Sequence, residues 1–270
     1  MKVVVSALIA VHKGTTLNGL KNALISLASQ DYKKMEIIIV IDGPIDKSLY
    51  DMCQKYATVV KVLKNNVGLG RALNEGLKSC KGKYIARLDC DDICLPGRIT
   101  LQADYLNNNT SISVVSGQAL EKNIWAKTVR KSTKVGKLGI NDFWLKNQII
   151  HPASMIRKVD LQKAGCFPGI RYTQDFVLWL RMLSLEMQLV NLSDELIDFG
   201  YSEKSKKLRT LEEFKRVLPA YREMYLLNLQ PFWKITIAIL IRLQFYVFNQ
   251  CVVSVLNFLE KLTWSKNEKH

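Results

Sequence analysis

The sequence predicts an α/β protein with a single, mainly parallel sheet flanked by helices and a helical, amphipathic C-terminal appendage. Strand-like and helix-like segments alternate over residues 3–92, and polar or charged residues follow the predicted strands, where open α/β sheets bind ligands. The composition then changes over residues 201–270. The chain has 270 residues, 48% of them apolar, which suits one sizeable core and an appendage.

The first part of the chain predicts a repeated strand–helix alternation. β-Branched and apolar runs indicate buried strands, and apolar residues at helical spacing indicate helices. The expected strands are Val3–Val11, Glu36–Ile41, Thr58–Leu63 and Lys83–Leu88, and the expected helices are Leu17–Ala28, Lys47–Tyr56 and Gly70–Ser79. Asp42-Gly43-Pro44 marks a turn directly after the second strand.

The pattern is less regular from residue 96 onward. A helix is expected at Pro96–Leu106 and a strand at Ile112–Leu120. Lys122–Lys137 is basic and has little apolar periodicity. The pattern indicates either a solvated loop or a contact surface for an anionic acceptor.

The charge and the cysteines limit the class of protein. The net charge of +15 fits nucleic acid, an anionic membrane surface or a phosphorylated substrate. Nucleic acid is the weakest of these, since the chain has no zinc finger, RNP-like motif or basic repeat. Six cysteines without a C-x-x-C pair indicate reduced thiols. The apolar start reads as a buried strand rather than a signal peptide, so we expect an intracellular protein.

Residues 201–270 contain twelve Lys and Arg against six acidic residues. Within them, Pro231–Leu262 is rich in aromatic and aliphatic residues, but polar side chains such as Arg242 interrupt every apolar run before it is long enough to span a bilayer. The pattern favours a pair of amphipathic helices lying in a membrane interface. The alternative is helices that pack on the core or on a second subunit of a homo-oligomer.

Asp89-Cys90-Asp91-Asp92 is the most informative motif. Three carboxylates at the end of a buried strand repel one another unless a cation or hydrogen bonds compensate. Oxygen ligands suit a hard divalent ion such as Mn²⁺ or Mg²⁺, which also binds substrate phosphates. The alternative is an acidic N-cap for the next helix.

Five blocks in this order resemble the family 2 glycosyltransferases. The resemblance covers about residues 3–185. The blocks are the opening segments up to Asp42-Gly43, the stretch Asn66–Gly76, the stretch Gly82–Asp92 with Pro96, Arg98 and Gln102, the segment His151–Met155, and the segment Gln174–Arg181.

The resemblance implies a GT-A fold over residues 1–200, with a nucleotide-sugar-binding half (1–95) and an acceptor half (96–200), followed by the basic helical region 201–270. It implies that Asp175 is the catalytic base and that Asp91, with Asp89, holds Mn²⁺ or Mg²⁺. The implied nucleotide-sugar-binding residues are Val11, His12, Asp42, Arg71, Asp89, Asp91 and Asp92. Candidate contacts of the diphosphate or the acceptor are His151, Trp179 and Arg181.

The expected reaction is inverting transfer of galactose or glucose from a UDP-sugar, with a β-linked product. The basic, aromatic C-terminal region suggests a lipid-diphosphate-linked acceptor of the GlcNAc-diphosphoundecaprenol type, in O-antigen, lipopolysaccharide or other surface-polysaccharide synthesis. We expect a peripheral protein on the cytoplasmic face of the inner membrane. The alternatives are another nucleotide sugar with a soluble or protein acceptor, a nucleotidyltransferase, and a non-catalytic membrane-bound scaffold.

Overall fold

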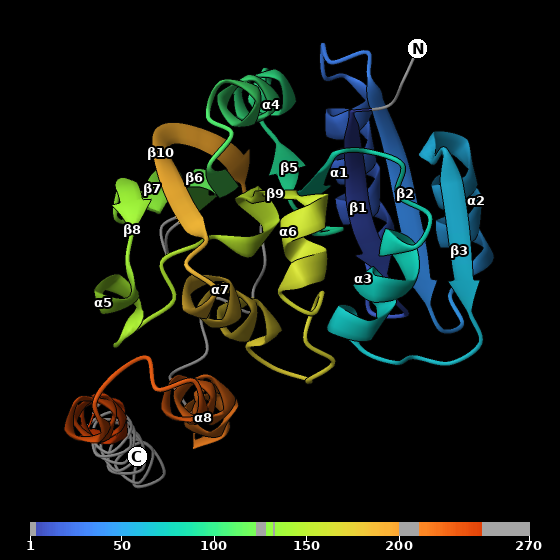
Figure 1. The fold of residues 1–270 in the computed structure, drawn as a ribbon. Helices are drawn as coiled ribbons and strands as arrows, with labels where there is room; N and C mark the ends of the chain where they lie inside the picture. The colour runs from blue at the N-terminus through green and yellow to red at the C-terminus, as the bar shows by residue number, and fades with distance from the viewer. Residues whose placement is uncertain (1–3, 123–127, 132, 200–210, 245–270) are drawn as a thin grey trace, which may run out of the picture. The chain divides into compact units, whose positions relative to one another are not determined.

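The computed structural model describes residues 4–122, 128–131, 133–199 and 211–244. The chain divides into two compact units, Met1–Ser202 and Glu203–His270. The first unit contains one ten-stranded sheet, and helices cover both of its faces (Figure 1). The predicted α/β architecture with a single sheet is confirmed.

The first part of the sheet is parallel, in the order β3-β2-β1-β4. Its strands are β1 (Val5–Val11), β2 (Met35–Asp42), β3 (Val59–Leu63) and β4 (Tyr84–Arg87), and the helices between them are α1 (Leu17–Ala28), α2 (Lys47–Tyr56) and α3 (Leu69–Leu77). Every residue of β1 is buried, as expected for a central strand with helices on both faces. The alternation predicted from the apolar runs is therefore present.

The two faces of this parallel part carry different helices. Ile9 of β1 shares a core cluster with Leu24 of α1 and Cys53 of α2. On the opposite face α3 approaches the sheet closely at Gly76, where a Cβ atom would lie 2.5 Å from Val40 Cγ2 and 2.6 Å from Leu8 Cδ1. Glycine at this position therefore sets how close α3 lies to the strands.

The second part of the sheet is mixed. Strand β9 runs antiparallel to β4 and to β6, β10 runs parallel to β6, and β5 runs antiparallel to β10. These elements are β5 (Ile93–Cys94), β6 (Ile112–Lys122), β9 (Met155–Arg157) and β10 (Gln188–Asp198), with helices α4 (Arg98–Asn108), α5 (Ile140–Phe143), η1 (His151–Ala153), α6 (Lys158–Lys163) and α7 (Gln174–Ser184). The start of α4 lies after the expected Pro96, because Gly97 adopts a left-handed φ of 74°.

The solvated-loop reading of Lys122–Lys137 is wrong for most of the described part. β7 (Thr128–Lys131) pairs with β6, and β8 (Gly136–Leu138) pairs with β10. Backbone pairing to two longer strands therefore stabilises a basic stretch that has no apolar periodicity of its own. The alternative reading, contact with an anionic acceptor, stays a prediction.

The second unit is helical in its described part. Helix α8 (Leu211–Leu226) contains Pro219, and residues 232–244 form a further helix. Arg242 Nε donates to Tyr221 Oη over 2.7 Å, which links the two helices. Within the described ranges, every helix falls short of the length and apolarity that a membrane-spanning segment requires. The rest of the expected segment Pro231–Leu262 lies outside the described residues.

Candidate active site

The ends of the parallel strands bring the predicted side chains to one edge of the sheet. Strands β2, β1 and β4 are parallel neighbours, so the residues that follow them lie at the same edge. His12 follows β1, Asp42 ends β2, and Asp89 follows β4 shortly after its last residue. Val11, the last residue of β1, has no exposed surface, whereas His12 is exposed.

Asp42 holds the loop between β3 and α3. Its carboxylate accepts hydrogen bonds from the backbone N–H groups of Val67 (2.7 Å) and Gly68 (3.1 Å), and its carbonyl oxygen accepts one from Asn66 Nδ2 (3.1 Å). Gly68 has a φ of 87° and precedes the first turn of α3. A carboxylate has more acceptor sites than these two bonds occupy, so Asp42 retains acceptor capacity for a ligand N–H.

The loop after β1 is tied to the acidic turn after β4. Thr15 Oγ1 accepts a hydrogen bond from the His12 backbone N–H (3.1 Å) and lies 3.3 Å from Cys90 Sγ. His12 Nδ1 accepts from the Gly14 backbone N–H (2.9 Å). The bond from Gly14 holds the imidazole of His12 at the edge of the sheet, where the side chain is exposed to solvent.

Helix α3 is held against the segment after α6. Asn74 donates from Nδ2 to the Phe167 carbonyl (2.8 Å) and accepts from the Phe167 N–H at Oδ1 (2.9 Å). A Cβ at Gly70 would overlap the Pro168 carbonyl oxygen, and one at Gly169 would lie 3.1 Å from Arg71 Nε. Arg71 is exposed and lies over this segment, so its guanidinium lies where the two halves of the unit meet.

The acidic turn rests on a buried arginine that the sequence reading did not use. Arg87, the last residue of β4, has no exposed surface and forms an ion pair with Asp89, whose side chain is 38% exposed. The Arg87 guanidinium also donates to the carbonyl groups of Leu8 and Leu88. A charged residue inside an otherwise apolar strand was the available signal, because a buried charge requires a partner.

The three carboxylates of the turn lie in different environments. Asp91 is exposed, while Asp92 is buried and its Oδ2 has no hydrogen-bond partner. Burial, together with the charges of Asp89 and Asp91, raises the pKa of Asp92 to about 8, against the opposing effect of Arg87 and of Arg98. Both arginines are buried, so two buried positive charges act on the carboxylates of the turn.

The donor set of this turn fits a divalent cation that is shared with a ligand. Its side chains offer carboxylate oxygens, the ligands that Mn²⁺ and Mg²⁺ prefer, and Asp92 Oδ2 is a buried oxygen without a partner. Among the residues that the structure describes, no three Asp, Glu, His or Cys side chains converge as a complete metal site. A cation held here would therefore take its remaining ligands from substrate phosphates and water, as Mg²⁺ commonly does.

Asp175 lies in the first turn of α7, after Thr173 in a left-handed conformation with φ of 53°. Asn147 Nδ2 donates to Asp175 Oδ2 over 2.8 Å. Burial raises the pKa of Asp175 and the charge of Asp89 adds to this, while the Phe176 and Asp175 backbone N–H groups and Asn147 lower it. The charge of Asp89 therefore reaches Asp175, although the two side chains come from different parts of the sheet.

Trp179 and Arg181 lie in α7 with Asp175, and His151 packs against Trp179. The rings of His151 and Trp179 meet edge to face, with their centroids 5.9 Å apart. The ring centroids of His151 and Phe167 are 5.8 Å apart. Trp179 has no exposed surface. Burial lowers the pKa of His151 well below its usual value, and the charge of Arg87 adds to this, so the imidazole is neutral. Arg181 is partly exposed.

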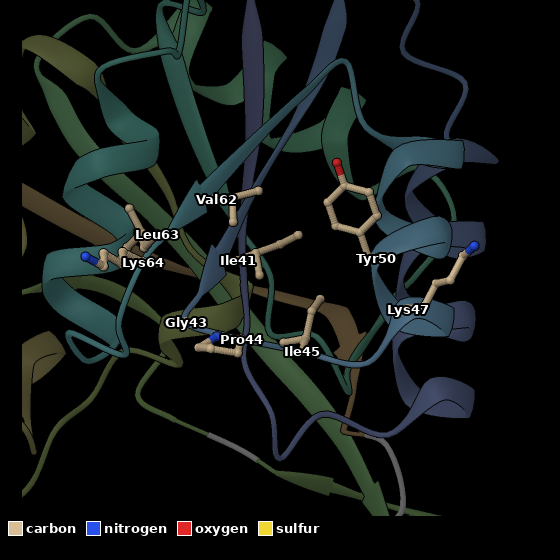
Figure 2. A pocket seen from close by; sticks show the side chains of 9 residues that line it. All are labelled: Ile41, Gly43, Pro44, Ile45, Lys47, Tyr50, Val62, Leu63 and Lys64. Carbon is tan, nitrogen blue, oxygen red and sulfur yellow. The ribbon is translucent and has the colours of Figure 1, made fainter.

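A pocket of about 470 Å³ lies beside the predicted site, between the ends of β2 and β3 and helix α2 (Figure 2). It is lined mainly by apolar groups, including Ile41, Pro44 and Val62, with Tyr50 on the α2 side. None of its lining residues is among the predicted site residues. The pocket therefore does not coincide with the carboxylate cluster.

Sequence comparisons agree with this geometry. The model of the family described as "Glycosyl transferase family 2" matches residues 6–166. The amylovoran biosynthesis glycosyltransferase AmsE of Erwinia amylovora is 32% identical over 243 residues, which cover 88% of this chain and 91% of that protein. The UDP-Gal:alpha-D-GlcNAc-diphosphoundecaprenol beta-1,3-galactosyltransferase of Escherichia coli is 25% identical over 232 residues, covering 82% and 84%.

Solved structures share the fold. The crystal structure of S. aureus TarS 1–349 matches with a TM-score of 0.66 at 17% identity, covering 88% of this chain and 71% of that one. The structure of the same TarS fragment in complex with UDP-GlcNAc matches with a TM-score of 0.64 at 17% identity, covering 82% and 66%. The GT-A fold expected from the resemblance is thereby confirmed. With the family model covering more than half of its length, the chain belongs to glycosyl transferase family 2.

Proposed function

We propose that this glycosyltransferase moves a hexose, galactose or glucose, from a UDP-sugar to a lipid-linked sugar acceptor with inversion at the anomeric carbon. One observation carries the proposal. The charge of Asp89, after β4, contributes to the raised pKa of Asp175, at the start of α7. In this proposal the candidate base and the candidate diphosphate site face the same space, as a single displacement requires.

The strand ends supply the donor site. In this proposal the retained acceptor capacity of Asp42 binds the uracil N–H, and Val11 and His12 border the base. The exposed guanidinium of Arg71 contacts a phosphate, and Asp89 contacts the ribose or a metal-bound water. The bonds from Asp42 to the loop before α3 support this arrangement, because they hold Arg71 and the base-binding carboxylate on one framework.

Mn²⁺ or Mg²⁺ completes the donor site in this proposal. Asp91 and Asp89 would hold the ion, and Asp92 supports the turn from the buried side. When bound, the ion neutralises negative charge that develops on the leaving diphosphate. Asp91 is the ligand best placed to meet a nucleotide from solvent, since it is the exposed carboxylate of the three.

Asp175 is proposed to take the proton of the acceptor hydroxyl. The hydroxyl attacks the anomeric carbon from the face opposite the diphosphate, so one displacement converts an α-linked donor into a β-linked product. A carboxylate with a raised pKa holds that proton better than an ordinary aspartate. In this proposal His151, Trp179 and Arg181 are candidate contacts of the diphosphate or the acceptor.

The acceptor assignment is supported by the relatives. The name of the E. coli relative specifies a GlcNAc-diphosphoundecaprenol acceptor and that of AmsE a role in amylovoran biosynthesis. We therefore assign this chain to surface-polysaccharide synthesis of the O-antigen or lipopolysaccharide type, with a lipid-diphosphate-linked acceptor.

A lipid-linked acceptor requires contact with the membrane, and the second unit offers a suitable surface. Trp233, Ile237 and Leu240 follow helical spacing on one exposed face of residues 232–244, with exposed fractions of 62%, 41% and 56%, and Phe232 beside them is 70% exposed. Residues buried within the same helix, such as Ile235, lie on the other face. An exposed apolar stripe on a helix that also carries Lys234 and Arg242 favours an interfacial position, so we place the protein peripherally on the cytoplasmic face of the inner membrane.

A donor screen tests the reaction. Purified protein, Mn²⁺ and a synthetic GlcNAc-diphosphate-lipid are incubated with UDP-galactose, UDP-glucose, UDP-GlcNAc and UDP-GalNAc in turn. We expect transfer from UDP-galactose or UDP-glucose and a β-linked product by NMR. An α-linked product would refute the inverting mechanism, and transfer only from an N-acetylated donor would refute the hexose assignment. Neither transfer nor UDP-sugar hydrolysis with any donor would favour the scaffold alternative.

A further inference from the structure

Asn147 lies in the segment between α5 and η1. Its side chain makes two hydrogen bonds, one as donor and one as acceptor. Its Nδ2 donates to Asp175 Oδ2 over 2.8 Å, and its Oδ1 accepts from the backbone N–H of Ile149 over 3.0 Å. The N–H of Ile149 can only donate, so the amide oxygen has to face it. The amide NH₂ therefore has to face Asp175, because the reversed amide would lose both bonds.

The residues that directly follow Asn147 are fixed to two strands of the sheet. Gln148 is buried, donates from Nε2 to the Asp142 carbonyl (2.9 Å) and accepts at its own carbonyl from Asn191 Nδ2 (2.8 Å). Ser116 of β6 donates to the Ile150 carbonyl (3.2 Å). Anchoring of Gln148 to β10 and of Ile150 to β6 restrains the backbone next to Asn147, which is a condition for preorganised positioning.

A fixed donor acts on Asp175 in two ways. It occupies Oδ2, so the carboxylate is held in one rotation about its Cβ–Cγ bond. It also stabilises the ionised carboxylate. Burial and the negative charge of Asp89 raise the pKa of Asp175, and the hydrogen bond from Asn147 lowers it. Both effects favour a carboxylate that is ready to accept a proton.

We propose that Asn147 is a positioning residue of the transfer reaction, which aims the carboxylate of Asp175 at the acceptor hydroxyl and keeps it unprotonated before the acceptor reacts. This inference rests on the proposed function, because it needs Asp175 as the base. No bond forms or breaks at Asn147. The proton passes from the acceptor hydroxyl to Asp175, and the amide holds the receiving group.

Two variants separate positioning from folding. Asn147→Asp keeps the oxygen that accepts from Ile149 N–H and so preserves the loop, but it replaces the donor with a second carboxylate beside Asp175. Asn147→Ala removes both bonds. Asn108→Asp is the matched control, since it makes the same chemical change at the exposed end of α4.

Activity is measured from pH 5 to 9 with the UDP-sugar that transfers in the donor screen. We expect kcat at pH 7 to fall roughly 10- to 100-fold in Asn147→Ala with KM nearly unchanged, the range for misplacing a catalytic group. The acidic limb of the pH profile should move up by about 1 to 2 units, the effect of losing a charge-assisted hydrogen bond. In Asn147→Asp it should move further, because two adjacent carboxylates share a proton.

A second readout needs no substrate. With ¹³C-labelled aspartate, the carboxyl resonance of Asp175 is identified by its absence in Asp175→Asn, and its titration is followed in each variant. We expect a higher midpoint in Asn147→Ala and a two-step titration in Asn147→Asp. The same midpoint in parent, Asn108→Asp and both Asn147 variants would overturn the inference.

The outcomes also separate this inference from the proposed function. If Asp175→Asn transfers sugar at the parental rate, Asp175 is not the base and the proposed mechanism fails. If Asp175→Asn is inactive while both Asn147 variants keep the parental kcat and pH profile, the mechanism stands and the role of Asn147 is wrong.

Discussion

Arg87 and Asp89 form an ion pair at the end of β4 in which the arginine has no exposed surface and the carboxylate is partly open to solvent. Asp89→Asn leaves the buried guanidinium without its counter-charge, so we expect the free energy of unfolding to fall by about 3 kcal/mol, the lower end for breaking a buried pair. Thermal unfolding by circular dichroism measures this. Asp91→Asn is the control, because Asp91 is exposed. Equal losses in the two variants would contradict the structural role of Asp89.

Transfer should depend on a divalent cation. We expect activity to vanish with excess EDTA and to return with Mn²⁺ or Mg²⁺. Asp91→Ala should lower kcat by at least ~10²-fold, the effect of removing a preorganised electrostatic group. Its melting temperature should stay near that of the parent, so the loss reports on the cation site rather than on folding. Full activity in EDTA would exclude a metal requirement.

Replacing the proposed base should separate chemistry from binding. Asp175→Asn keeps the shape of the side chain but cannot accept the proton, so we expect transfer to fall ~10²- to 10⁴-fold. UDP affinity, measured by calorimetry, should stay near the parental value. Because burial raises the pKa of Asp175, the parental activity should also decline on acidification well above pH 3.8, where an ordinary aspartate titrates. A profile that is flat down to pH 4 would exclude Asp175 as the base.

Asp92 should make the metal-free protein less stable as the pH rises. Its pKa is raised from 3.8 to about 8 in the folded state, so the folded protein binds more protons than the unfolded chain between these values. Stability is therefore lost as the pH increases through this range, by up to about 6 kcal/mol at 1.36 kcal/mol per pKa unit. Asp92→Asn should remove the decline in melting temperature between pH 5 and 9, in EDTA.

The matched control for this titration is Asp51→Asn, on the exposed surface of α2. That variant should follow the parental curve. The prediction fails if Asp92→Asn and Asp51→Asn show the same dependence of melting temperature on pH.

The second unit should bind anionic membranes. Trp233→Glu with Ile237→Glu places charges on the exposed apolar face, so we expect less co-sedimentation with phosphatidylglycerol vesicles, while UDP binding stays unchanged. The neighbouring Lys and Arg residues add about 1 kcal/mol each near an anionic surface, so parental binding should weaken with salt. Val62→Glu in β3, at a residue 55% exposed, is the control. Absence of parental binding at low salt would refute the membrane assignment.

Truncation distinguishes the two readings of this region. Deletion of residues 231–270 should release the protein from membranes and leave UDP binding in the first unit intact. If the truncated chain is insoluble or unfolded instead, the helices complete the core or an oligomer, which is the alternative to membrane docking.

The parallel half of the fold was predictable because its strands β1, β2 and β4 are buried on both faces and so form continuous apolar runs. The convergence of Asp42 and Asp89 followed from this, since neighbouring parallel strands end at one edge. Strands β7 and β8 were not predictable, because they are short and basic and exist through pairing with longer strands. The role of Asn147 was not predictable either, because an asparagine in an irregular segment has no periodic signal. Its partner, Asp175, is distant in the sequence and lies in α7.

The two-way bond between Asn74 and the Phe167 backbone has a consequence for how the enzyme moves. It fastens α3 to the segment after α6, while the sheet runs without interruption from β4 through β9 to β6. The parallel and the mixed parts of this unit are thus joined both by a shared sheet and by these two hydrogen bonds. A bending motion of one part against the other would have to break these two bonds first, so we expect substrate entry and product release to involve displacement of individual loops.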